Sequence, residues 1–181
     1  RLAAASDPLT HPDVLARLVA ESDHLGAATA LRNPSCPPGV LSRVAAEGET
    51  GLRVIAAAHP NTPLGVLASL AGDPNRLVRK AVAANPASRP ETLTAVDAHR
   101  PRHPRVDAAL AANPNTPPGV LAELAASKSV HVRQALAANP NTPAGVIEHF
   151  ARSQVPLTRS LAEAGHPGTS PARLAELAGD D

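Results

Sequence analysis

The stretch that decides the fold is Asn113-Pro114-Asn115-Thr116-Pro117-Pro118-Gly119-Val120-Leu121. Phrases of the same form occur seven times in the 181 residues: Asn, Asp or His before proline, then Thr, Ser or Cys, then proline and usually an apolar pair. They start at Asp7, Asn33, His59, Asn85, Asn113, Asn139 and His166, in steps of 26, 26, 26, 28, 26 and 27 residues. Self-similarity at a nearly fixed period identifies a tandem repeat array.

Each residue type in the phrase has a physical role. Proline moves the residue before it out of the helical region, so a preceding helix must end there. The asparagines can bond nearby backbone and close a tight turn; they are Asn33, Asn85, Asn113 and Asn139. The hydroxyl column is predicted to cap the N-terminus of the next helix; it includes Thr62, Thr116 and Thr142. The proline that follows suits a first helical turn.

Two short helical segments are predicted in each repeat. The first runs from Pro117 to about Ser127 in the fifth repeat, with Val120, Leu121 and Leu124 on one face. The second covers 130–138, or 77–84 in the third repeat, and its alanines allow neighbouring backbones to approach closely. At about eight residues it could be α or 3₁₀. Isolated helices this short are unstable in water, so their stability must come from stacking.

The phrase N-P-N-T-P, together with V-R-x-A-L/V-A-x-N-P, resembles the leucine-rich repeat variant family over nearly the whole chain. The resemblance implies an all-α, right-handed α-solenoid of about seven 26-residue repeats, without a sheet. Each repeat would alternate a short α-helix with a shorter α- or 3₁₀-helix. A bacterial source is expected with it. Some members hold an iron–sulfur centre on an N-terminal cysteine cluster, but Cys36 is the single cysteine here, so no cofactor is expected.

The array is predicted to form one repeat domain over residues 1–181. Arg1-Leu2-Ala3-Ala4 matches the residues before later turns, so the chain opens in the second half of a repeat. It closes just after the first helix of the seventh repeat. Both ends are therefore expected to lie within a repeat of a longer array.

Composition argues against an enzyme. The chain has one aromatic residue, Phe150, whereas enzyme pockets are usually lined by apolar and aromatic side chains. His99 and His103 have the spacing of helical metal ligands, but Pro101 and Pro104 would break that helix, so no metal site is expected. No apolar run is long enough to span a bilayer. The net charge of +1 gives no strong overall attraction to membranes or nucleic acid. A cytoplasmic protein without a small-molecule cofactor is expected.

A column of arginines occupies one structural position, six residues before each turn. It contains Arg53, Arg79 and Arg133, with Asp107 interrupting it. These side chains could form a row of forks for carboxylate or phosphate groups of a ligand. The alternative is structural: each could bond to carbonyl groups or acids of a neighbouring repeat, for example Glu49 or Asp73.

Basic residues are concentrated between 76 and 105, including the enlarged loop of the fourth repeat. The binding candidates there are Arg76, Arg79, Arg100, Arg102 and Arg105. An enlarged loop in a regular array is a typical place for a binding specialisation, although sequence drift would look the same. We expect a non-enzymatic scaffold that binds a protein or peptide on its curved surface. The alternative functions are phosphate-backbone binding by a basic groove on repeats three and four, and a passive spacer.

Overall fold

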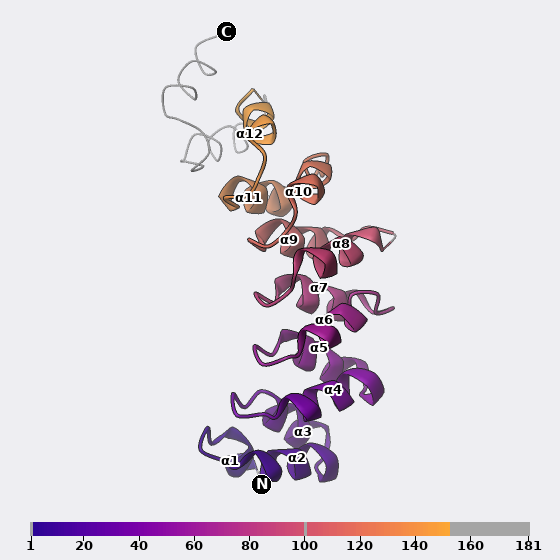
Figure 1. Ribbon diagram of the computed structural model, residues 1–181, viewed down its shortest axis with the longest axis vertical. Coiled ribbons are helices and arrows are strands. Elements are labelled where there is room, and N and C mark those ends of the chain that lie inside the picture. Colours follow the sequence, from indigo (N-terminus) through magenta and orange to yellow (C-terminus); the bar gives the residue numbers. More distant parts are fainter. Residues whose placement is uncertain (1, 100, 153–181) are drawn as a thin grey trace. The chain divides into compact units, whose positions relative to one another are not determined.

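The computed structural model describes residues 2–99 and 101–152, and its regular structure is entirely helical in that part of the chain (Figure 1). The predicted all-α repeat fold is confirmed. The chain divides into two compact units, Arg1–Ser88 and Arg89–Asp181, and each is described by itself.

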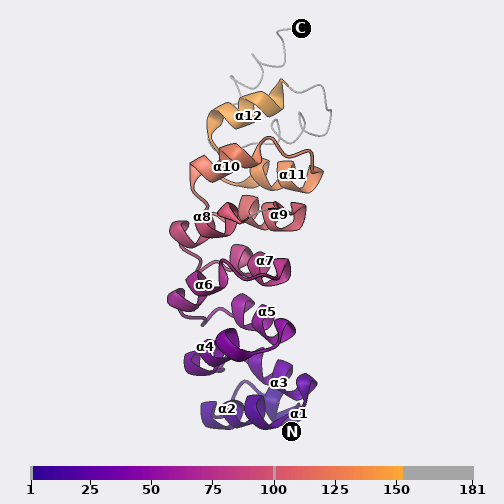
Figure 2. The same cartoon turned by 90° about the vertical axis from the view of Figure 1, so that its right-hand side faces the viewer.

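The first unit, Arg1–Ser88, alternates two kinds of helix in two columns (Figure 2). The first helices of the repeats form one column, in which α4 contacts α6, and the second helices form the other, in which α1 contacts α3, α3 contacts α5 and α5 contacts α7. The helices are α1 (Leu2–Ser6), α2 (Pro12–Glu21), α3 (His24–Leu31), α4 (Pro38–Glu47), α5 (Thr50–Ala58), α6 (Leu64–Leu70) and α7 (Arg76–Ala84).

The second unit, Arg89–Asp181, continues the same alternation within its described residues. Its second helices, α9 and α11, pack directly on each other, and α10 contacts both. The helices are α8 (Pro90–Ala98), α9 (Pro104–Ala112), α10 (Pro118–Leu124), α11 (Val130–Ala138) and α12 (Ala144–Ala151). The seventh predicted repeat, which starts at His166, lies outside the described residues.

Prolines set where the first helices begin. Proline is in the first turn of α2, α4, α8 and α10, where its missing N–H leaves no hydrogen bond unmade. In α6 and α12 the proline lies one position earlier: Pro63 and Pro143 are extended N-cap residues. The sequence therefore dictates the turn-to-helix junctions almost residue by residue.

The second segment is α-helical in every repeat where the structure describes it, which answers the question that its length left open. It runs for nine residues in α5, α7, α9 and α11. The expectation that it is the shorter helix is wrong in two repeats, where α6 and α10 have only seven residues. These first helices end early because tight turns begin at Ala71 and Ala125. In these turns the amides of Asp73 and Ser127 donate to the carbonyls of Leu70 and Leu124, respectively.

The core between the two columns is aliphatic. The first helices contribute fully buried leucines at equivalent positions, among them Leu41, Leu67, Leu93 and Leu121. The second helices contribute small residues such as Ala56, Ala57 and Ala83, which allow close helix packing. Phe150 is 2% exposed and belongs to the core. In the described part of the chain, no helix is long and apolar enough to cross a membrane.

Candidate partner-binding site

The asparagine of each turn makes two sets of hydrogen bonds. In Asn139, Oδ1 accepts from the amide of Asn141 at 3.0 Å, which closes the residue's own turn. Nδ2 donates backwards to the carbonyls of Ala111 at 2.7 Å and Asn113 at 2.9 Å, in the preceding repeat. The sequence predicted the turn, whereas the bonds to the preceding repeat were missed, because they depend on how the repeats stack.

The same pattern recurs in the first unit. Asn85 donates to the carbonyls of Ala57 and His59 and accepts from the amide of Ala87. Asn33 likewise donates to Ala5 and Asp7 and accepts from Ser35. Asn113 accepts from the amide of Asn115 at 2.9 Å. All four asparagines are buried, so these bonds lie where water cannot replace them.

His59 replaces asparagine and reproduces its bonds with a ring. Nε2 lies 3.0 Å from the carbonyl oxygen of Asn33, and Nδ1 lies 3.1 Å from the amide nitrogen of Asn61. Because an amide can only donate, Nδ1 must be the acceptor, and Nε2 then carries the proton that is donated to Asn33. His59 is therefore a structural substitute for asparagine.

The hydroxyl column caps a different helix from the one predicted. Thr62, Thr116 and Thr142 each donate to a carbonyl six residues earlier, at 2.5 to 2.6 Å. Those carbonyls belong to the last turn of the second helix, where acceptors lack partners within the helix. The expected N-cap role is wrong, because a hydroxyl can donate as well as accept and the extended prolines occupy the N-cap positions of α6, α10 and α12.

Cys36 fills the hydroxyl column in the second repeat. Its side chain is 1% exposed, and burial raises the pKa of the Cys36 thiol to about 11. The thiol is consequently protonated at neutral pH, which is the unreactive form of cysteine. The described residues contain no group of three or more His, Cys, Asp and Glu side chains that could hold a metal ion.

The arginine column is engaged within the protein. Arg53 forms a bidentate pair with Asp73, with Nε 2.8 Å from Oδ2 and NH2 3.3 Å from Oδ1. It also donates to the carbonyl of Gly48 at 2.9 Å. The pKa of the Arg53 guanidinium is raised, chiefly by its hydrogen bonds to Asp73. Of the two acids expected as partners, Asp73 pairs with Arg53, while Glu49 lies 3.5 Å from His24.

Arg79 and Arg133 bond to the loops that precede their own helices. Arg79 is 6% exposed and donates to the carbonyls of Asp73 at 2.6 Å and Pro74 at 3.0 Å. Arg133 donates to the carbonyl of Lys128 at 3.3 Å. These two guanidinium groups bond to loop carbonyls of their own repeat, whereas Arg53 pairs with an acid of a neighbouring repeat, as the structural alternative expected.

The basic stretch 76–105 is divided between the two compact units. Arg76 is exposed on the first unit, whereas Arg105 is exposed on the second. Arg102 is engaged: it pairs with Asp97 at 2.9 Å and with Glu123 at 2.8 Å. Arg100 lies outside the described residues. The predicted basic groove on repeats three and four is therefore divided: Arg76 and Lys80 are exposed on the first unit, and Arg89 and Arg105 on the second.

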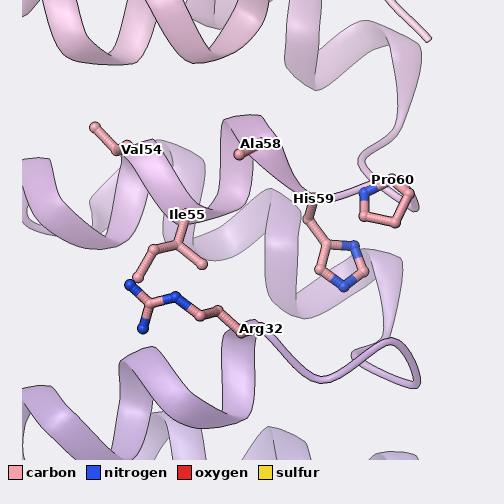
Figure 3. Close-up of a pocket in the computed structure, with 6 residues that line it drawn as sticks. All are labelled: Arg32, Val54, Ile55, Ala58, His59 and Pro60. Carbon is pink, nitrogen blue, oxygen red and sulfur yellow. The ribbon is translucent and has the colours of Figure 1, made fainter. Parts of the chain in front are cut away.

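A pocket in the first unit was missed by the sequence interpretation. It has a volume of about 310 Å³, is formed by the end of α3 and by α5 with its turn, and is lined by Arg32, Val54, Ile55, Ala58, His59 and Pro60. Figure 3 shows the Arg32 side chain running beside Ile55, with His59 and Pro60 at the opposite end of the pocket. A signal was present: Arg32 stands where later repeats have Ala58, Ala84, Ala112 and Ala138.

Comparison with known proteins relates both units to one kind of repeat. A family model described as leucine rich repeat variant matches residues 50–75, and one described as leucine rich repeat variant domain matches residues 105–161. No curated protein matches the chain.

One solved structure has a similar fold. It is described as a leucine-rich repeat variant with a novel repetitive protein structural motif, and it is 22% identical to this chain with a TM-score of 0.62. The match covers 83% of this chain and 60% of the solved chain. At that identity the likeness establishes the fold alone.

Proposed function

We propose, on the premise of the leucine-rich repeat variant family that these matches support, that this chain is a non-enzymatic scaffold that binds a protein or peptide. A bacterial source and a cytoplasmic location remain predictions from the sequence. The observation that carries the proposal is the contrast, within each repeat, between a constant frame and a variable surface.

The constant part holds the stack together. Buried asparagines or His59 bond to the preceding repeat, and buried threonines or Ser88 close the preceding helix. The variable part is the surface of the second helices. The fifth position before the turn is Val54, Lys80, Ala108 and Gln134 in four successive repeats, and none of these four side chains is buried. A fixed frame that presents different side chains at equivalent positions is typical of repeat proteins that bind extended partners.

A selection experiment tests this function directly. The full 181-residue chain is immobilised and exposed to a display library of random peptides, with an unrelated helical repeat protein as the control. The proposal predicts peptides that bind this chain with micromolar dissociation constants and do not bind the control. A library that yields no such peptide, in repeated selections against well-folded chain, contradicts it.

Nucleic-acid binding is kept as the alternative because Arg76, Lys80 and Arg105 are exposed. Binding to phosphates by lysine and arginine falls steeply with salt. Retention of duplex DNA at about 50 mM salt that is lost by about 200 mM would favour the alternative. Absence of retention at low salt would dismiss it.

A further inference from the structure

The pocket beside Arg32 is lined by residues that depart from the repeat pattern. Arg32 replaces the alanine of the position before the turn, and Ile55 replaces the alanine found at Ala81, Ala109 and Ala135. His59 replaces asparagine in the adjoining turn. Three departures from the repeat pattern thus line one pocket. Since the His59 substitution preserves the structural bonds, the Arg32 and Ile55 substitutions are the ones that change the surface.

The guanidinium of Arg32 has hydrogen-bonding capacity to offer a ligand. Within the described residues its hydrogen bond is a long one, 3.4 Å from NH1 to the carbonyl of Ala28 in the same helix. None of the six lining residues is acidic, and no ion pair of Arg32 exists in that part of the chain. Arginine carries five donors in a planar fork that matches a carboxylate. The contrast with Arg53, which holds Asp73, is direct.

The rest of the pocket is apolar or already bonded. Val54, Ile55, Ala58 and Pro60 present hydrocarbon. Both ring nitrogens of His59 are occupied by backbone partners. A ligand that fits this lining has one anionic group beside an aliphatic one.

The turn at the end of the pocket argues against a chain terminus as the anion. Capture of a terminal carboxylate generally uses a nest of free backbone N–H groups. Here the amides of His59, Asn61 and Thr62 already donate to Ala56, His59 Nδ1 and the His59 carbonyl, respectively, and Pro60 has no N–H. One guanidinium with no further cation also suits a singly charged carboxylate better than a doubly charged phosphate.

We propose that this pocket binds an acidic side chain, Glu or Asp, of an internal peptide segment, with an adjacent Leu, Ile or Val of that segment on Val54 and Ile55. The inference rests on the proposed peptide-binding function and names the chemistry of its partner. Arg32 supplies the charge-assisted hydrogen bonds, and Ile55 supplies the apolar contact.

The test compares selections with two versions of the full chain. The random-peptide library is selected against the wild-type protein and against Arg32→Ala, which restores the alanine of Ala58 and Ala84 and so retains the fold. The wild type is expected to enrich an acid next to an aliphatic residue, and Arg32→Ala is expected not to. A synthetic enriched peptide should bind Arg32→Ala about five- to tenfold more weakly, as should its Glu→Gln version with the wild type.

Matched variants separate this site from a general charge effect. Arg43→Ala removes an exposed arginine of the same unit that is neither a binding candidate nor part of the pocket, and should leave peptide affinity unchanged. Arg32→Glu should reject the acidic peptide and bind its Glu→Lys version better than the wild type does. Circular dichroism melts confirm that each variant is folded.

The outcomes distinguish the two proposals. Enriched peptides that lack an acid, or that bind Arg32→Ala as tightly as the wild type, overturn the pocket assignment while peptide binding stands. Equal weakening by Arg43→Ala overturns it as well. Failure to enrich any specific peptide contradicts the function itself.

Discussion

Two loops are each tied to a neighbouring repeat by an ion pair, but the loop contributes the acid Asp73 in one case and Arg102 in the other. In the first unit the acid lies in the loop, and Arg53, from the helix of the preceding repeat, reaches it at 2.8 Å. In the second unit the arginine lies in the loop, and it reaches Asp97 and Glu123 on α8 and α10. In both regions an ion pair ties a loop to a neighbouring repeat.

The ion pairs of the two loops differ in the solvent exposure of their side chains. The Asp73 side chain is 5% exposed and that of Arg53 is 19% exposed. Asp97 and Arg102 are 9% and 27% exposed, so the main difference lies in Glu123, which is 62% exposed. Buried pairs depend strongly on both partners being present, and exposed pairs contribute little. The comparison indicates that the charged residues of the loops differ between repeats, while the core leucines and the turn asparagines stay constant.

The largest effect is expected in the constant core. Leu67 and Leu121 occupy equivalent positions in the two regions and are both fully buried. Leu67→Ala and Leu121→Ala should each lower the free energy of unfolding by about 2–5 kcal/mol, measured by urea denaturation. Costs below about 0.5 kcal/mol for either variant would mean that the assigned helix face is wrong.

The loop ion pairs should give unequal effects. Asp73→Ala leaves Arg53 without its carboxylate and removes the acceptor of the Asn75 amide, so we expect a loss of about 2–3 kcal/mol. Arg102→Ala breaks an exposed pair with Glu123 and a more buried pair with Asp97, and should cost less, about 1–2 kcal/mol. Denaturation midpoints of the two variants measure this difference. Equal costs would show that exposure does not separate the loops.

The sequence predicted the features that depend on neighbours along the chain. Prolines marked the helix starts, the 3.6-residue spacing marked the buried faces, and the asparagines marked the turns. The roles of Arg53 and Arg102 could not be predicted, because the sequence does not show which arginine pairs with an acid of the protein and which could bind a ligand. Both were ligand candidates, and both pair with acids about twenty residues away, in a neighbouring repeat.

The remaining misses have the same physical origin. Asn139 bonds to Ala111 and Asn113 only because one repeat stacks on another. Thr62 was assigned to the following helix because a hydroxyl can donate or accept, and only the three-dimensional arrangement selects between these roles. The pocket of Arg32 and Ile55 joins residues of two repeats, so it becomes visible in sequence only when equivalent positions are aligned.

An intermediate effect is expected at the asparagine turns. Asn139→Ala leaves the amide of Asn141 and the carbonyls of Ala111 and Asn113 without their partner, and should cost about 1–3 kcal/mol. Asn113→Ala should cost a similar amount, because Asn113 closes the Asn115 turn. His59→Asn, which restores the repeat residue, should stay within about 0.5 kcal/mol of the wild type. Thermal melts compare the three, and an unchanged melting curve for Asn139→Ala would refute the role of its side chain.

The smallest effect concerns the one departure in the hydroxyl column. Cys36→Thr should let the new hydroxyl donate to the carbonyl of Ala30, the equivalent of the bond from Thr62 to Ala56, and should raise stability by about 0.5–1.5 kcal/mol. Unfolding in urea at neutral pH measures the gain. A destabilised variant would show that the second repeat does not share this cap.

The same substitution should change the response to alkali. Because burial raises the pKa of the Cys36 thiol from 9.0 to about 11, the folded wild type holds this proton more tightly than the unfolded chain. That stabilisation is present below pH 9 and is lost as the pH rises towards 11. Cys36→Thr should therefore lose less stability than the wild type between pH 8 and pH 10. Identical losses would contradict the protonated, buried thiol.

The central claim is that the side chain of the turn residue, asparagine or His59, bonds a repeat to the backbone of the preceding turn. Nuclear magnetic resonance can detect these bonds directly, as scalar couplings across the hydrogen bond from Asn139 Nδ2 to the carbonyl carbons of Ala111 and Asn113. We predict measurable couplings and slow solvent exchange of that side-chain amide. Absent couplings, with exchange as fast as in a free asparagine, would contradict the account.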